Sequence, residues 1–273
     1  MSITVKTFPR LVDAAGALAQ ERGARFLAGG TLVMRDVNNA DPEIETIIRS
    51  TDPSFSHIAA SSGRVELAGG VTMAAVLAER DLAFLHPVAR AVGGPALREA
   101  ATIGGNLFAG IGVFATALLA LDATVILAGG FGQRELPLDD FLGRGDRGAA
   151  LVSAVAFKRP TGEALRFTKV TRVHPKGLSV LSIAAQLPLA SGRVTGARVA
   201  YAGMSPAPFR AKAVERALEG RSLDAAGIAP ALAVASDGTS PADDPIASAW
   251  WRREILPVHL RRLLLGEQTV RQS

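Results

Sequence analysis

Two short glycine turns contain the residues of this sequence that are best suited to chemistry. The first, AGGTLV at residues 28–33, follows an apolar stretch, and the second, TIGGN at residues 102–106, precedes another. Glycine lets backbone N–H groups approach an anion closely, and a helix that begins at the turn adds a favourable dipole. Two such turns could hold the two ends of a diphosphate. A Gly-Gly turn is also an ordinary connection between elements, so both interpretations stay open at this point.

The sequence gives little support for other kinds of site. Neither turn matches a Walker A loop or the G-x-G-x-x-G pattern, and no G-x-S-x-G is present. The adjacent acids at 139–140 and 243–244 do not form a carboxylate dyad, because neighbouring side chains on one element point in different directions. The chain has no cysteine and four histidines. This composition excludes disulfides and thiolate-bound clusters within the chain and argues against a histidine-rich metal site.

Composition indicates a folded protein with more than one compact part. The chain has 273 residues, 48% of them hydrophobic and 20% charged, and a net charge of +5 with the excess of Lys and Arg in the C-terminal half. The arginines are scattered, and one Tyr and two Trp offer few stacking surfaces, so we do not expect nucleic-acid binding. The basic half is interpreted as a solvated surface or as a docking surface for an acidic protein, with Arg252, Arg253, Arg261 and Arg262 as candidates.

One apolar stretch, residues 107–131, carries Asp122 as its single charge. A membrane helix needs about 20 apolar residues, and Asp122 leaves too few on either side of it. We therefore expect a buried helix near 114–121 followed by a buried strand near 124–127, and no membrane span. The first residues show no apolar core of a signal peptide, so a cytoplasmic location is expected.

The elements that position the first turn form a small α/β lobe. The opening ITVKTF, residues 3–8, indicates a short strand. Apolar spacing then predicts a helix over 11–22, a short strand at 25–28 that runs into the turn, and a helix over 32–38 after it. A further strand near 44–48 completes this lobe, at about residues 1–53.

The remaining residues divide into a second lobe and a different C-terminal part. Residues 54–160 begin with a hairpin and contain helices and the second turn. From residue 161 we expect an antiparallel sheet with helices on one side, built from strands near 166–170, 182–189 and 193–202 and helices near 212–218 and 248–265. The predicted domains are therefore 1–160 and 161–273.

The order of motifs along nearly the whole chain resembles one family. AGGTLV and ATIGGN together resemble the FAD-binding medium subunit of the xanthine dehydrogenase and carbon monoxide dehydrogenase family of molybdenum hydroxylases. Further matching stretches are FP at 8–9, GGVT at 69–72, LLALDA at 118–123, LPLDDF at 136–141, FTKV at 167–170 with Arg172, and GMSPAPFRA at 203–211. The resemblance implies an α+β fold in which two small α/β lobes form a PCMH-type FAD-binding domain, followed by the C-terminal domain of antiparallel sheet and helices.

The resemblance also implies which residues contact FAD. The first turn and the second turn would take the diphosphate and nearby groups, a threonine would lie near the first turn, and a leucine and a lysine would lie near the flavin. The implied residues are Ala28, Gly29, Gly30, Thr31, Leu32, Val33, Thr72, Thr102, Gly104, Gly105, Asn106, Leu151 and Lys169. The family has an acid after the second turn that helps to bind the nucleotide, whereas Val113 stands near that position in a shortened stretch.

The implied function is electron transfer, with no catalytic acid or base in this chain and no metal ligands. The resemblance implies a molybdopterin-binding large subunit, an iron–sulfur small subunit and an external electron acceptor, so the chain alone is an incomplete oxidoreductase. Two alternatives stay open. One is a stand-alone FAD-dependent oxidoreductase of the same fold, and the other is a flavin-free structural subunit, which the missing acid favours.

Overall fold

The chain folds into two compact units. The computed structural model describes residues 3–61, 63–109, 112–129, 132–144, 150–161, 165–173 and 177–267. The first unit consists of Met1–Ala109 and Ala123–Arg159, and the second consists of Gly110–Asp122 and Pro160–Ser273. In this division a short central segment belongs with the C-terminal part. The domain limits 1–160 and 161–273 stay a prediction.

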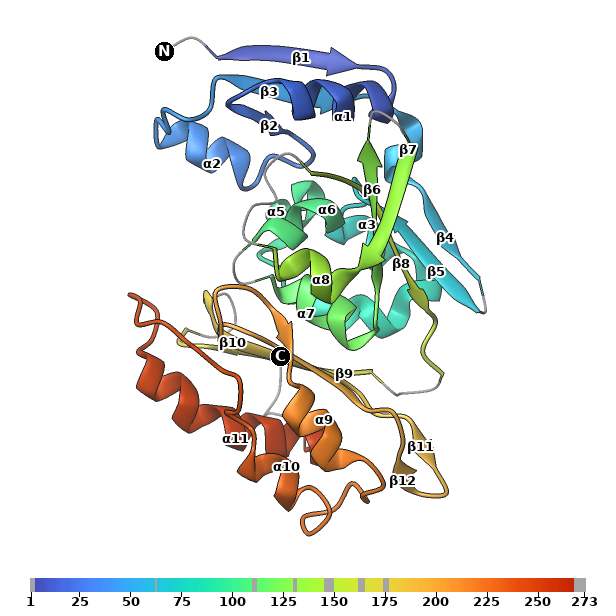
Figure 1. Cartoon of the computed structure of the whole chain (residues 1–273), viewed down its shortest axis with the longest axis vertical. Helices are drawn as coiled ribbons and strands as arrows, with labels where there is room; N and C mark the ends of the chain where they lie inside the picture. The colour runs from blue at the N-terminus through green and yellow to red at the C-terminus, as the bar shows by residue number, and fades with distance from the viewer. Residues whose placement is uncertain are drawn as a thin grey trace. The chain divides into compact units, whose positions relative to one another are not determined.

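The first unit begins with a three-stranded parallel sheet in the order β1-β3-β2. Its strands are β1 (Thr4–Phe8), β2 (Ala24–Phe26) and β3 (Thr46–Ser50). Helix α1 (Leu11–Gln20) lies against this sheet (Figure 1), because its buried residues Leu11, Ala14, Ala15 and Leu18 recur at helical spacing. Helix α2 (Val33–Asn38) follows the first glycine turn. The predicted strand–helix–strand–turn–helix–strand order of this lobe is confirmed.

A five-stranded antiparallel sheet forms the rest of the first unit, in the order β4-β5-β8-β6-β7. Its strands are β4 (Ile58–Ala60), β5 (Arg64–Ala68), β6 (Thr124–Gly129), β7 (Gly132–Pro137) and β8 (Leu151–Lys158). Short helices accompany it: the 3₁₀ segments Pro53–Ser56 and Arg80–Leu85, and α3 (Met73–Ala78), α4 (His86–Arg90), α5 (Pro95–Ala100), α6 (Ile103–Phe108) and α8 (Leu138–Leu142). The second glycine turn opens α6.

One apolar cluster connects the two sheets of the first unit. Leu11 and Leu18 of α1, Ile48 of β3, Phe55 and Leu151 of β8 are buried together. The ring of Phe55 also meets Phe26 edge to face at a centroid distance of 5.6 Å. Because burial of these side chains holds the lobes together, the two glycine turns are carried on one packed unit.

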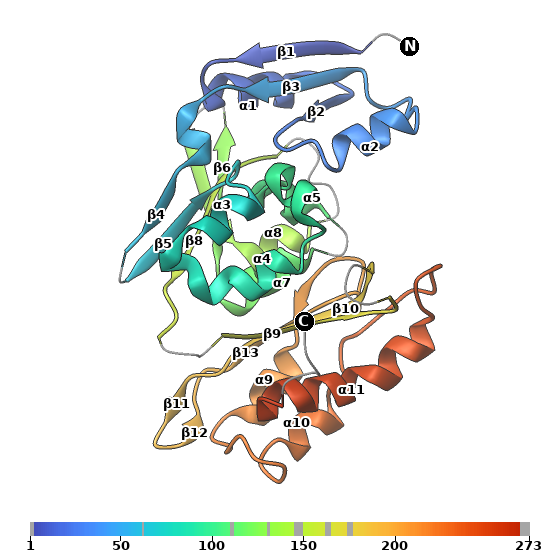
Figure 2. The ribbon, with the colours of Figure 1, turned by 180° about the vertical axis from the view of Figure 1, so that it is seen from behind.

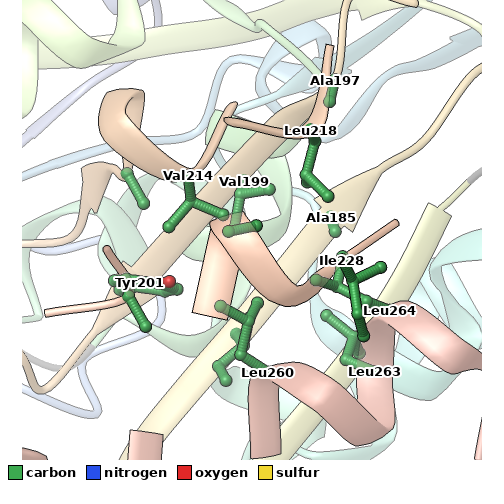
Figure 3. Packing of buried hydrophobic residues seen from close by; sticks show 14 of the residues in the cluster. Ala185, Ala197, Val199, Tyr201, Val214, Leu218, Ile228, Leu260, Leu263 and Leu264 are labelled. Carbon is green, nitrogen blue, oxygen red and sulfur yellow. The ribbon is translucent and has the colours of Figure 1, made fainter. Parts of the chain in front are cut away.

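The second unit is built on a four-stranded antiparallel sheet in the order β14-β13-β10-β9. Its strands are β9 (Leu165–Thr171), β10 (Ser179–Gln186), β13 (Arg198–Ala202) and β14 (Phe209–Arg210), with a separate hairpin of β11 (Leu189–Ala190) and β12 (Arg193–Val194). Helices α9 (Lys212–Leu218), α10 (Ala229–Ala233) and α11 (Ala249–Leu265) cover one face of this sheet (Figure 2). Their apolar residues form a single core (Figure 3), which contains Leu260 and Leu264 of α11 together with Val199 and Tyr201 of β13.

Helix α7 (Val113–Ala120) belongs to the second unit and is buried along its whole length. It lies against β10 and β13. Residues Ile183 and Tyr201 point into the core beneath α9 and α11, so the alternating residues Ala184 and Ala200 face the other way and leave room for a helix. The predicted antiparallel sheet with the C-terminal helices on one side is confirmed, and α7, from the middle of the chain, lies on its other face.

Two further sequence predictions are settled by this fold. The apolar stretch 107–131 divides into the end of α6, then α7 and β6, and in the described part of the chain no helix is long and apolar enough to cross a membrane. The single strand predicted over 193–202 is instead β12 and β13. They are separated at Gly196, whose φ of 64° is a left-handed conformation that breaks a strand.

Candidate functional site

The first glycine turn contains a run of backbone donors that have no partner. Before it, the Leu27 N–H donates to the Ile48 carbonyl at 2.7 Å, and after it the Met34 N–H donates to the Gly30 carbonyl at 2.9 Å. Between them, the N–H groups of residues 28–33 meet no acceptor in the part of the chain that the structure describes. All six residues are half-buried. Backbone donors in such surroundings are nearly always paired, so this turn has the donor set of an anion site.

Gly30 and Leu32 explain why these donors stay free. Gly30 has a φ of 74°, in the left-handed region that glycine adopts without the steric cost of a Cβ atom. Helix α2 begins after Leu32, which provides no side-chain cap, so the Val33 N–H at its start also lacks an acceptor in the described chain.

Gly29 brings the two glycine turns together. A Cβ atom placed on Gly29 would lie 1.6 Å from the Ala100 carbonyl oxygen and 3.1 Å from Cγ2 of Thr102. Only a residue without a side chain allows this approach. The first turn therefore lies directly against the segment that leads into the second turn.

The second turn uses most of its own donors. The Ile103 N–H donates to the Val71 carbonyl at 2.9 Å, and the Gly104 N–H donates to the Gly69 carbonyl at 2.8 Å. The Gly105 N–H donates to Oγ1 of Thr102 at 3.1 Å, which caps α6.

The Asn106 N–H donates to the Thr102 carbonyl, so four of the five N–H groups of this turn are paired within the chain. A contact between Thr102, Gly104, Gly105 or Asn106 and FAD stays a prediction. The geometry gives this turn a supporting role in which it fixes the position of the first turn.

Thr72 lies beside the second turn. It forms an isolated antiparallel bridge with Thr102, and its Oγ1 accepts the Ala75 N–H at 3.1 Å as the cap of α3. Thr102 therefore contacts both other residues: Gly29 of the first turn packs against it, and Thr72, the cap of α3, is bridged to it. The structure brings these three predicted residues together, while contact of Thr72 with a cofactor stays a prediction.

Leu151 and Lys169 occupy different surroundings. Leu151 is the first residue of β8, is 1% exposed, and belongs to the cluster against which Ala28 of the first turn also packs. Lys169 lies on β9 of the second unit, opposite Ser182 in the register. Burial lowers the pKa of the Lys169 ammonium group below its ordinary value. The predicted roles of both residues near a flavin stay predictions.

Two sequence observations can be followed into the structure. Val113 is the first residue of α7 and is 7% exposed, so no carboxylate occupies that position; Gly110 and Ile111, in the shortened stretch before it, lie outside the described residues. Among the residues that can be described, no group of three His, Cys, Asp or Glu side chains is arranged to hold a metal ion.

The prediction that Arg252 docks an acidic neighbour was wrong. Its side chain is buried, with Nε donating to the Val180 carbonyl at 3.0 Å and Nη2 donating to Asp244 at 2.7 Å. The guanidinium group therefore holds the loop before α11 against the sheet. Arg253 and Arg262 are exposed, whereas Arg261 pairs with Glu267.

A third glycine pair, Gly69-Gly70, packs beside the second turn. The sequence indicated this pair only as part of the family stretch GGVT, with no role in the site. A Cβ atom on Gly69 would lie 2.1 Å from the Val152 carbonyl oxygen, and one on Gly70 would lie 2.6 Å from the Phe55 carbonyl oxygen. The backbone there passes between β8 and the second turn, and Gly69 accepts the Gly104 N–H. The repeated Gly-Gly pattern is the only sequence feature that could have indicated this pair. Its packing role depends on Val152 and Phe55, which are brought beside it only by the tertiary fold.

Two family models match the chain. Residues 6–156 match the FAD binding domain in molybdopterin dehydrogenase, and residues 166–266 match the CO dehydrogenase flavoprotein C-terminal domain. The glyceraldehyde dehydrogenase medium chain of Sulfolobus acidocaldarius is 28% identical over 181 residues, which cover 64% of each chain. The xanthine dehydrogenase FAD-binding subunit of Escherichia coli O157:H7 is 26% identical over 234 residues, which cover 78% of each chain.

Solved structures show the same fold. A chain of the carbon monoxide dehydrogenase from Hydrogenophaga pseudoflava matches with a TM-score of 0.89 at 19% identity, and a chain of quinoline 2-oxidoreductase from Pseudomonas putida 86 matches with a TM-score of 0.86 at 21% identity. Each match covers 97% of this chain and 96% of the solved chain. The family match spans the first turn, with its free donors, and the second turn beside it. The chain therefore belongs to the family of FAD-binding oxidoreductase domains found in molybdopterin dehydrogenases.

Proposed function

We propose that this chain holds FAD by its diphosphate at the first glycine turn and acts as the electron-transfer subunit of a heteromeric molybdenum hydroxylase. The observation that carries the proposal is the run of N–H groups from residue 28 to residue 33 that lack a protein acceptor. A diphosphate has enough oxygen atoms to accept several of these donors, and charge-assisted hydrogen bonds are stronger than neutral ones. The residues present therefore fit FAD.

The chain's own residues would perform distinct tasks in binding. Gly30 sets the direction of the turn through its positive φ, and Gly29 allows the turn to rest on the carbonyl of Ala100. The Thr31 hydroxyl adds a further donor for a phosphate oxygen. Lys169 provides a cation that would stabilise negative charge on a reduced flavin or on a phosphate. When bound, FAD supplies the chemistry that links one-electron transfer to two-electron transfer.

The rest of the reaction needs partner subunits. The chain contains no cysteine to ligate an iron–sulfur cluster, and its described part contains no metal-ligating cluster. A large subunit would bind molybdopterin and hydroxylate the substrate, a small subunit would carry the iron–sulfur clusters, and an external acceptor would take the electrons. The relatives named as a medium chain and as an FAD-binding subunit support this arrangement. A cytoplasmic location belongs to the same proposal, and cell fractionation tests it.

Cofactor release tests the binding step. Flavin would be released by heating the purified protein and identified by chromatography, with FAD expected and FMN not expected. The substitution Gly30→Ala should weaken FAD binding, whereas Gly192→Ala is the matched control. Gly192 has nearly the same φ, 75° against 74°, and open space around its Cβ position. Both variants should lose a similar ~1–2 kcal/mol of stability from left-handed strain, so an equal loss of FAD affinity in both would contradict the proposal.

Val113 favours one alternative, a flavin-free structural subunit, because it stands near the position where the family has an acid. Reconstitution distinguishes the two functions. If excess FAD never binds to a folded preparation that still assembles with its partners, the structural alternative is correct. If FAD binds and is reduced only when the partners and their substrate are present, the electron-transfer proposal is correct.

A further inference from the structure

A cavity of about 530 Å³ lies within the second unit, on the side of the sheet that carries α11. Its apolar walls are Val170 of β9, Val180 of β10, Ile246 of the preceding loop, and Trp251 and Ile255 of α11. Pockets for small molecules commonly have about 300–1,000 Å³ and mostly apolar walls. The cavity is therefore large enough for a compact ligand, and the Trp251 side chain forms part of its wall.

The polar side chains that line the cavity can all donate hydrogen bonds. They are Thr171, Arg172, Ser248, Trp251 and His259. No carboxylate lines the cavity among the residues that the structure describes. The nearby loop acids are used elsewhere, since Asp244 binds Arg252 and Asp243 accepts the Ala249 N–H. A cavity with several donors, one permanent cation and no acid has the polarity of an anion site.

Arg172 is held in place while part of its donor set stays free. Its Nη1 donates to the carbonyl groups of Pro245 at 3.2 Å and Ile246 at 3.3 Å, which fixes the guanidinium group at the loop. Its Nε and Nη2 have no acceptor within the described ranges. Two adjacent N–H groups of a guanidinium match the two oxygens of a carboxylate.

His259 also lines the cavity, and one of its ring nitrogens is enclosed by the protein. Its Nδ1 atom is buried and has no hydrogen-bond partner in the described chain. Burial, and secondarily the nearby charge of Arg262, lower the pKa of the imidazole, so the ring is neutral near pH 7. A buried polar atom without a partner costs free energy.

We propose that this cavity is a binding site for a small molecule that joins a carboxylate to a compact apolar body, preferably an aromatic ring. The carboxylate binds the free N–H groups of Arg172 with help from Thr171, and the ring lies against Trp251 between the aliphatic walls. All the residues that line the site belong to the second unit. A bound ligand would join α11 to the edge strand β9 and stabilise the second unit.

The two tryptophans of the chain, Trp250 and Trp251, permit a direct test. The substitution Trp250→Phe leaves Trp251, which lines the cavity, as the single reporter. This full-length variant would be titrated with phenylacetate, with neutral 2-phenylethanol and with acetate while tryptophan fluorescence and Tm are recorded. A saturable fluorescence change and a rise in Tm are expected with phenylacetate, and much weaker responses with the other two probes.

Three further variants in the Trp250→Phe background locate the site. Arg172→Gln should raise the Kd for phenylacetate about tenfold, which corresponds to one charge-assisted hydrogen bond. Thr171→Val keeps the shape of the side chain and should raise the Kd about threefold. Arg253→Gln removes the same charge from an exposed position of α11 that does not line the cavity, and it should leave the Kd unchanged. No saturable response, equal binding of 2-phenylethanol, or equal effects of Arg172→Gln and Arg253→Gln would each overturn the proposal.

Discussion

Gly29→Ala tests the packing of the first glycine turn against the second. The new Cβ atom would lie 1.6 Å from the Ala100 carbonyl oxygen, whereas an ordinary van der Waals contact begins near 3.4 Å. The two backbones must therefore separate by about 1.8 Å. Both atoms belong to the main chain or are bonded directly to it, so no side-chain rotation relieves the overlap. Overpacking of this kind costs typically about 1–3 kcal/mol of folding free energy.

The same displacement moves the free N–H groups of the turn away from any anion that they bind. A shift of this size exceeds the tolerance of a hydrogen bond, whose donor–acceptor distances span about 2.7–3.2 Å. Loss of one charge-assisted bond is worth about 1.5–3 kcal/mol, which weakens FAD binding by about 10-fold to 150-fold. The expected result is a large loss of FAD affinity together with a moderate loss of stability.

The assay combines flavin fluorescence titration with chemical denaturation of the apoprotein. Gly16→Ala is the control, because Gly16 lies inside α1 with nothing within 4 Å of its Cβ position, and alanine there should stabilise the helix by ~0.5–1 kcal/mol. If Gly29→Ala lowers stability but keeps wild-type FAD affinity, the turn is only a structural connection. If neither quantity changes, the close approach to Ala100 is wrong.

Three further predictions concern the second unit. Tyr201→Phe should raise the free energy of unfolding by about 1 kcal/mol, because the buried hydroxyl has no partner in the described chain. Burial raises the pKa of Tyr201, so above about pH 10 only the unfolded chain loses the phenol proton and the native protein becomes less stable. Tyr201→Phe should reduce this loss of stability, as measured by urea titration. Burial lowers the pKa of His259, so the unfolded chain binds the extra proton and stability should fall as the pH drops below about 6.5; His259→Gln should flatten that part of a Tm–pH profile. Arg252→Met should cost about 3–5 kcal/mol in denaturant unfolding, because it leaves Oδ2 of Asp244 and the Val180 carbonyl without the Arg252 donors; a cost below 1 kcal/mol would contradict this role.

The local pattern of the sequence predicted most individual elements. The spacing of Leu11, Ala14, Ala15 and Leu18 predicted α1, and the apolar residues 114–121 predicted the buried helix that the structure contains as α7. Such elements are determined locally, because the period of apolar residues matches the period of the helix. The strand predicted over 193–202 was wrong, because the left-handed conformation at Gly196 depends on the turn that the chain makes there.

The sequence by itself determined that two glycine turns occur in an ordered set of family motifs, and this was enough to identify the family and its cofactor. Only the tertiary structure separated the roles of the turns. The donors of the first turn have no acceptor within the described chain, whereas those of the second are used by Val71, Gly69 and Thr102. It also showed that Arg252 is an internal residue and that α7 lies against a sheet formed by later residues. The physical reason is that a hydrogen bond or a packing contact depends on which distant residues arrive beside a group, and a local pattern carries no information on that.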